Sequence, residues 1–113
     1  MTPEEVLATY MAARAHYAAV CRRYNRSSAA RYRLRHEHED AHDTMFKAKQ
    51  RFDLIPWMLQ VMHMNKTELA LLRKGDVWAL SFRGQVFTNG TMNYQQALAK
   101  MQQALALLEE KSP

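Results

Sequence analysis

The chain is poor in residues that interrupt regular structure, because its 113 residues include only three glycines and three prolines. This scarcity favours long helices, and it excludes glycine-rich loops of the kind that cradle phosphate. The single cysteine, Cys21, cannot form an internal disulfide. No apolar run approaches the roughly 20 residues of a membrane span, and no secretion leader is recognisable. We therefore expect a cytoplasmic protein in a reducing setting, with no membrane partner.

What is present is the composition of a folded domain, with 48% apolar and 24% charged residues. A chain of this length supports one core, so we predict a single helical domain over residues 1–113. The net charge of +5 is unevenly distributed. Seven arginines and no acid lie between Val6 and Arg35, and four acids follow between Glu37 and Asp43. A basic balance of this kind favours nucleic acid or an acidic protein as partner.

Apolar residues recur at alternating steps of three and four along two segments of the first half. This spacing places each set on one face of an amphipathic helix, as in a coiled coil. The first set is Val6, Tyr10, Ala13, Tyr17, Val20 and Tyr24. The second set is Leu34, His38, Ala41, Met45, Ala48, Phe52, Ile55, Leu59 and Met62.

The segment 25–28 between the two sets indicates a turn. Asn25 can adopt the left-handed conformation that ends a helix, and serine is a good cap for the next helix. The prediction is an antiparallel helical hairpin. The facing pairs would be Val6 with Met45, Tyr10 with Ala41, Ala13 with His38, and Tyr17 with Leu34. The alternative is one long helix from Pro3 to about Phe52, since the two sets are in phase, and such a helix would need a partner chain.

The second half predicts short elements around a small β-hairpin, so the fold class is mainly α. Pro56 should end the preceding helix. Tyr94 to Glu110 has the pattern of an amphipathic C-terminal helix, begun by Asn93 with Gln96. The other expected elements are a helix over 56–62, a helix over Thr67–Arg73 that Gly75 stops, strands over Val77–Phe82 and Gln85–Thr88 with a turn at Arg83–Gly84, and a turn at Asn89–Gly90.

One stretch combines arginines with tyrosines and is a candidate binding segment. Arginines can grip phosphates while tyrosine rings stack on exposed bases, which gives the hypothesis of a nucleic-acid-binding protein. The same side chains would also suit an acidic patch on a protein. The candidate residues are Arg22, Arg23, Tyr24, Arg26, Arg31, Tyr32, Arg33 and Arg35.

The letters HEDAH at residues 38–42 match the HExxH pattern, in which two histidines bind zinc and a glutamate acts as base. His38 and His42 are thus candidate ligands for a zinc-dependent hydrolase, our third hypothesis. The segment offers no clear third ligand, and the chain is short for a protease domain. We therefore predict no metal, no other cofactor and no enzymatic activity. Cys21 and His16 would lie on different faces of a helix, so Cys21 is interpreted as a small buried residue.

A surplus of methionine and aromatic residues suggests an adaptable apolar interaction face. The face would be made by Phe52, Trp57, Met58 and Met62. In the hairpin these residues project beyond the first helix, so they need cover from the rest of the chain, a second copy or a partner. The leading hypothesis is a small non-catalytic protein-binding module that forms a homo-oligomer. By analogy with chains of this size, it would be an inhibitor, adaptor or regulator of the kind that phages and mobile elements encode.

Overall fold

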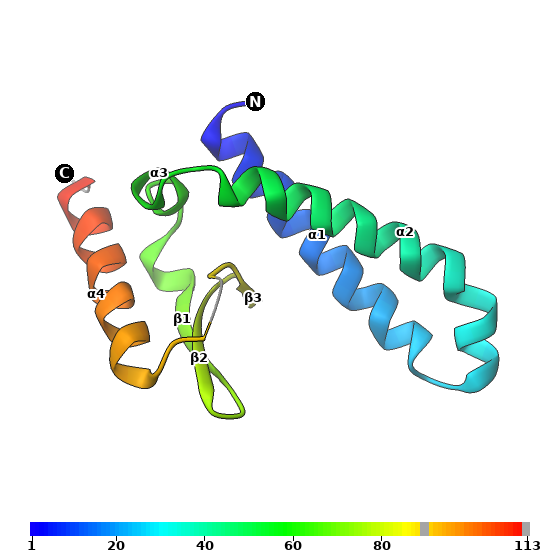
Figure 1. Cartoon of the computed structure of the whole chain (residues 1–113). Coiled ribbons are helices and arrows are strands. Elements are labelled where there is room, and N and C mark those ends of the chain that lie inside the picture. Colours follow the sequence, from blue (N-terminus) through cyan, green and yellow to red (C-terminus); the bar gives the residue numbers. More distant parts are fainter. Residues whose placement is uncertain (89–90, 112–113) are drawn as a thin grey trace. The chain divides into compact units, whose positions relative to one another are not determined.

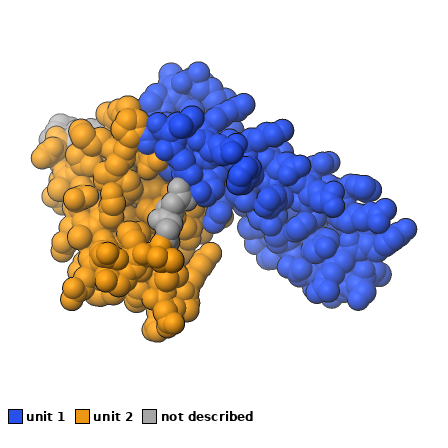
Figure 2. Space-filling view, in the orientation of Figure 1, with its two compact units in different colours: residues 1–55 blue, residues 56–113 orange. Residues whose placement is uncertain are grey.

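The computed structural model describes residues 1–88 and 91–111, which group into two compact units, residues 1–55 and residues 56–113 (Figure 2). The prediction of a mainly helical chain is confirmed (Figure 1). The helices are α1 (Pro3–Tyr24), α2 (Ser28–Asp53), α3 (Trp57–Val61), the 3₁₀ turn η1 (Lys66–Glu68) and α4 (Tyr94–Lys111). The strands are β1 (Leu69–Lys74), β2 (Val77–Phe82) and β3 (Gln85–Val86). None of the helices in the described part of the chain combines the length and apolarity that crossing a bilayer requires.

The first unit is the antiparallel hairpin of α1 and α2, so the alternative of one long helix is wrong. The Thr2 hydroxyl caps α1 by accepting a hydrogen bond from the backbone of Glu5 at 3.2 Å. The Ser27 hydroxyl caps α2 in the same way, accepting from Ala30 at 3.1 Å. Asn25 ends α1 with a φ of −83°, so the expected left-handed conformation is not used. The caps satisfy backbone donors that a helix start leaves unpaired, and they fix where the chain turns.

Both predicted helix seams form the buried interior of the hairpin. Most members are buried, and the exceptions are half-buried tyrosines, His38 and residues near the seam's end. The buried members of the first-unit seams are Val6, Tyr10, Ala13, Val20, Leu34, Ala41, Met45, Ala48 and Phe52.

The facing pairs differ from the prediction, because each α1 ring meets a later residue of α2 than expected. Tyr10 stacks on Phe52, with ring centroids 5.0 Å apart, and does not pair with Ala41. Tyr17 lies against His38 and His42, both at 5.5 Å, and not against Leu34. Part of this difference arises because helical side chains lean toward the N-terminus of their own helix. In a hairpin, α1 side chains therefore lean away from the turn and α2 side chains lean toward it.

The second unit contains a three-stranded antiparallel sheet in the order β1-β2-β3. Leu69 pairs with Phe82 and Lys74 with Val77, so a two-residue turn at Gly75–Asp76 joins β1 to β2. The predicted hairpin of β2 and β3 is confirmed, with Arg83 and Gly84 at φ 54° and 78°. Two successive positive φ angles are typical of the turn type that matches strand twist.

The predicted helix over Thr67–Arg73 is wrong. The Asn65 side chain accepts from the backbone of Thr67 at 3.1 Å, but it caps only the 3₁₀ turn η1. The leucines and alanine that follow favour a helix by propensity, yet pairing with β2 turns them into β1. Gly75, at φ 61°, is therefore part of a hairpin turn and not a helix stop.

The start of α4 agrees with the prediction. The Asn93 side-chain oxygen Oδ1 accepts from the backbone N–H of Gln96 at 2.8 Å, and the Gln96 side-chain oxygen Oε1 accepts from the backbone N–H of Asn93 at 3.0 Å. This reciprocal capping box satisfies two backbone donors at once. On α4, Ala97, Ala104 and Leu108 are buried. The predicted turn at Asn89–Gly90 lies outside the described residues.

Candidate functional site

The predicted arginine and tyrosine segment lies where α1 ends, the chain turns and α2 begins (Figure 1). We call the six arginines and Tyr32 of this region the arginine tip. All six arginine side chains are exposed to solvent. The caps described above produce this grouping, since they end one helix and start the next within residues 24–28. The tip consists of Arg22, Arg23, Arg26, Arg31, Tyr32, Arg33 and Arg35.

Only one of these arginines has an acidic partner in the described residues 1–88 and 91–111. The Arg23 guanidinium donates to both Glu37 carboxylate oxygens, at 3.0 and 3.5 Å. Both side chains are 40–50% exposed, so this ion pair adds little to stability. The other arginine charges of the tip are not balanced by an ion pair within the described chain. A charged surface of this kind attracts an anionic partner.

The two tyrosines of the segment have different surroundings. Tyr32 is 73% exposed, and the Arg35 guanidinium lies over its ring at 5.0 Å from the centroid. Tyr24 is half-buried and stacks on His38, with centroids 4.1 Å apart and planes 17° apart. Tyr24 therefore packs inside the hairpin, and Tyr32 is the ring available to a partner.

A small polar cluster inside the hairpin was missed by the sequence analysis. The Cys21 sulfur lies 3.6 Å from His38 Nε2, and Tyr17 is a second neighbour of the thiol. The hydrogen bond with Cys21, followed by burial, raises the pKa of Tyr17. Cys21 had been compared only with His16, on its own helix. Its true partner is 17 residues away, and only the register of the hairpin could have revealed it.

The candidate metal ligands do not form a site in the described chain. His38 is half-buried between rings, and His42 stacks on Phe46 with centroids 6.3 Å apart. The nearest carboxylate to His42 Nδ1 is that of Asp43, at 3.7 Å. Within residues 1–88 and 91–111, no three metal-ligating side chains come together. Since a zinc site needs three or four protein ligands, the arrangement does not support the zinc-dependent hydrolase.

The predicted apolar face is not assembled as expected. Phe52 is fully buried in the first unit, where it stacks on Tyr10. In the second unit, Trp57 stacks on Phe87 and carries the Lys100 ammonium 4.2 Å above its ring. Met58 remains 62% exposed and Met62 is half-buried. These two methionines line a groove of about 320 Å³ together with Leu59, Leu107 and Glu110.

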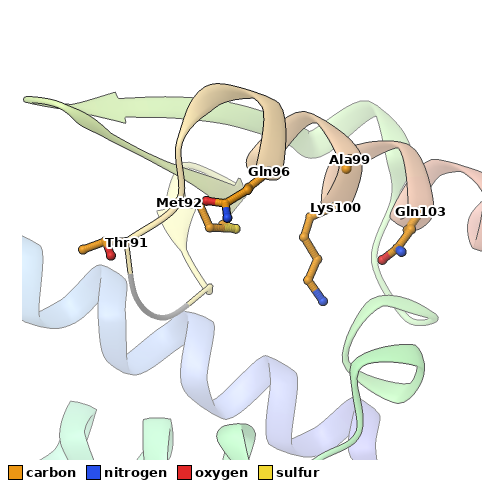
Figure 3. A pocket seen from close by; sticks show the side chains of 6 residues that line it. All are labelled: Thr91, Met92, Gln96, Ala99, Lys100 and Gln103. Atoms are coloured by element: carbon orange, nitrogen blue, oxygen red, sulfur yellow. The ribbon is translucent and has the colours of Figure 1, made fainter.

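A second, more polar hollow lies along α4 and the segment before it. It measures about 430 Å³ and is lined by side chains that offer a hydroxyl, two amides and an ammonium (Figure 3). The Lys100 ammonium faces the Trp57 ring, so it is not free to balance an anion alone. The hollow is open to solvent, and none of the residues predicted to form a binding or metal site lines it. Its lining residues are Thr91, Met92, Gln96, Ala99, Lys100 and Gln103.

Comparison with protein-family models, with curated proteins and with solved structures finds no match to this chain.

Proposed function

We propose that this protein is a non-catalytic nucleic-acid-binding protein whose arginine tip contacts the phosphate backbone. One observation carries the proposal: exposed arginines gather at the turn of the hairpin, and of these six arginines only Arg23 is paired with an acid in the described residues. A guanidinium matches the geometry of a phosphate and can donate two hydrogen bonds to it. Five unpaired guanidinium groups provide a phosphate-binding surface without any groove or pocket.

The start of α2 strengthens this surface. The N-terminus of a helix carries partial positive charge, and acids normally balance it. The first turn of α2 contains no acid, while Arg31 lies directly after it. The positive charge of Arg31 interacts unfavourably with this end of the helix dipole, at a cost of some tenths of a kcal/mol. A bound phosphate would remove that cost, because it satisfies both the helix end and the side chains.

The placement of the apolar residues favours this proposal over the protein-binding module. Of the four residues expected to form one apolar face, Phe52 is buried and Trp57 is half-buried and stacked on Phe87. The second candidate function is binding of a protein through the groove of Met58, Leu59 and Met62, which is favoured by the 62% exposure of Met58. Five residues line this groove, far fewer than the roughly 20–30 per partner of a stable interface, and none of them is an aromatic anchor of the kind typical of interface centres.

Salt dependence of binding tests the proposal. Neutralising five phosphates should give a plot of log K against log salt with a slope of about −3.5 for single strands and about −4.5 for duplex DNA. The measurement is fluorescence anisotropy with labelled oligonucleotides over a series of salt concentrations. The triple variant Arg26→Ala/Arg31→Ala/Arg33→Ala should bind more weakly and reduce the slope for single strands to about −1.4.

The matched control removes the same amount of charge elsewhere. Lys47, Lys66 and Lys74 are exposed and lie outside the arginine tip. Their triple alanine variant has the same net charge as the arginine triple variant. We expect this control to retain most of the wild-type affinity and slope. Equal losses in the two triple variants would mean that only net charge matters, and no binding at low salt would refute the proposal.

A further inference from the structure

We infer that the nucleic acid bound by the arginine tip is single-stranded, and that one of its bases stacks on the Tyr32 ring. The inference rests on the proposed function, since it names the strand that the same surface would take. Two observations support it, and neither was used to argue for binding of the phosphate backbone. One is the exposure of an aromatic ring among the arginines, and the other is the position of the acidic run on α2.

The Tyr32 ring is placed as a stacking platform. A tyrosine on a helix usually buries part of its ring, yet this side chain is 73% exposed. The Arg35 guanidinium lies 5.0 Å from the ring centroid, which is within the distance of a cation–π interaction. Arg31 and Arg33 flank Tyr32 in the sequence and are also exposed. An exposed ring on a basic surface can take a base while guanidinium groups elsewhere on that surface take the phosphates.

Only an unpaired base can use this platform. In a duplex the faces of the bases are covered by their neighbours, and a protein reaches only the base edges in the grooves. In a single strand the bases can be splayed out, so an aromatic ring can stack on them. The exposed ring of Tyr32 therefore adds binding energy for a single strand and none for an intact duplex.

The acidic run on α2 limits the length of the contact. The basic part of α2 reaches from Ser28 to Arg35, which is eight residues and about 12 Å of helix. Glu39, Asp40 and Asp43 follow and are exposed. A duplex lying along α2 would meet these carboxylates, whereas a flexible strand can cross the tip and turn away. The surface thus suits a few nucleotides of single strand.

The test compares affinities for short oligothymidylate, oligouridylate and a DNA duplex of the same length, measured by anisotropy at one low salt concentration. Both single strands should bind more tightly than the duplex. Tyr32→Ala should weaken binding of the single strands by about 5- to 150-fold and leave duplex affinity unchanged. Tyr32→Phe should keep the wild-type affinity, because it retains the ring. The two single strands show whether the sugar affects binding.

Phe46 provides the matched control for the loss of an aromatic ring. It lies on the same helix and is 50% exposed, but it lies beyond the acidic run and away from the basic segment. Phe46→Ala should leave all affinities unchanged. Equal binding of single strands and duplex, or a loss in Tyr32→Ala no larger than in Phe46→Ala, would overturn the inference and leave backbone binding standing. If none of the three oligonucleotides bound, both would fail.

Discussion

Replacing Phe52 with alanine tests the packing of the hairpin. Phe52 was expected to project beyond the first helix on an apolar interaction face, but its side chain has 0% exposure and stacks on Tyr10, which is 1% exposed. The two ring centroids are 5.0 Å apart and the planes are 28° apart. The substitution removes a complete aromatic ring from the end of the hairpin's buried seam. If the ring packs as described, the free energy of unfolding must fall substantially.

The size of the loss follows from burial and from the cavity that remains. Transferring a large apolar side chain out of water contributes about 1.5–3 kcal/mol, and its stacking on another ring adds about 0.5–1.5 kcal/mol. With the cavity included, a buried phenylalanine replaced by alanine costs about 3–5 kcal/mol. This is a large part of the roughly 5–15 kcal/mol that stabilises a domain. The melting temperature should fall by roughly 12–20 °C, at about 4 °C per kcal/mol.

The assay is urea unfolding followed by circular dichroism, with Phe46→Ala as the control. Phe46 lies on the same helix but is 50% exposed, so its loss should change the free energy of unfolding by about 0.5 kcal/mol or less. A double-mutant cycle with Tyr10→Ala should give a coupling of about 0.5–1.5 kcal/mol, as expected for stacked rings. A cost for Phe52→Ala no greater than that for Phe46→Ala would refute the packing described here.

Two further predictions concern a tyrosine and a cap. Burial, as the largest cause, raises the pKa of Tyr10 above its ordinary value of 10.0, so above pH 10 the unfolded chain loses this proton while the folded chain keeps it. The folded state then binds more protons than the unfolded state, so the free energy of unfolding falls as pH rises above 10. A Tyr10→Phe variant should show a smaller fall when urea unfolding is measured at successive alkaline pH values. The same dependence on pH in both proteins would contradict this. Ser27→Ala removes the hydroxyl that caps α2 and should lower the free energy of unfolding by about 1 kcal/mol in the same assay. Ser28→Ala, one residue further on, should cost much less. A larger loss for Ser28→Ala than for Ser27→Ala would show that Ser27 is not the cap.

The periodicity of apolar residues predicted helix throughout the first unit, while the turn residues at 25–28 favoured two helices over one long helix. It did not give the register of the hairpin, because contacts depend on the direction in which side chains lean as well as on spacing. Phe52 was therefore expected to project beyond the first helix and to need other cover, and the Cys21–His38 contact was overlooked. In the second unit, local propensity at residues 69–74 favoured a helix, and only pairing with β2 decides for a strand.

For the candidate site, side-chain charge was enough to predict which residues are exposed, whereas their spatial arrangement was not predicted. The arginines could be placed on the surface from their charge alone, since unpaired guanidinium groups are rarely buried. The two tyrosines could not be separated in this way, because both have arginines within two residues on each side in the sequence. Helix phase separates them: Tyr24 continues the buried seam of α1 and stacks on His38, while Tyr32 lies off the seam of α2.

The arrangement of α2 separates the residues that hold the fold from those proposed to bind. Leu34 and Ala41 face the interior, while Arg33 and Arg35 face solvent on the same helix. Arg31 lies next to the first turn of α2, where the helix dipole disfavours a cation, and neither Arg33 nor Arg35 makes an ion pair in the described residues, so removing these arginines should not destabilise the hairpin. Residues that oppose a local rule without a compensating contact are expected at functional positions. An anionic ligand is the compensation that the described chain itself does not provide.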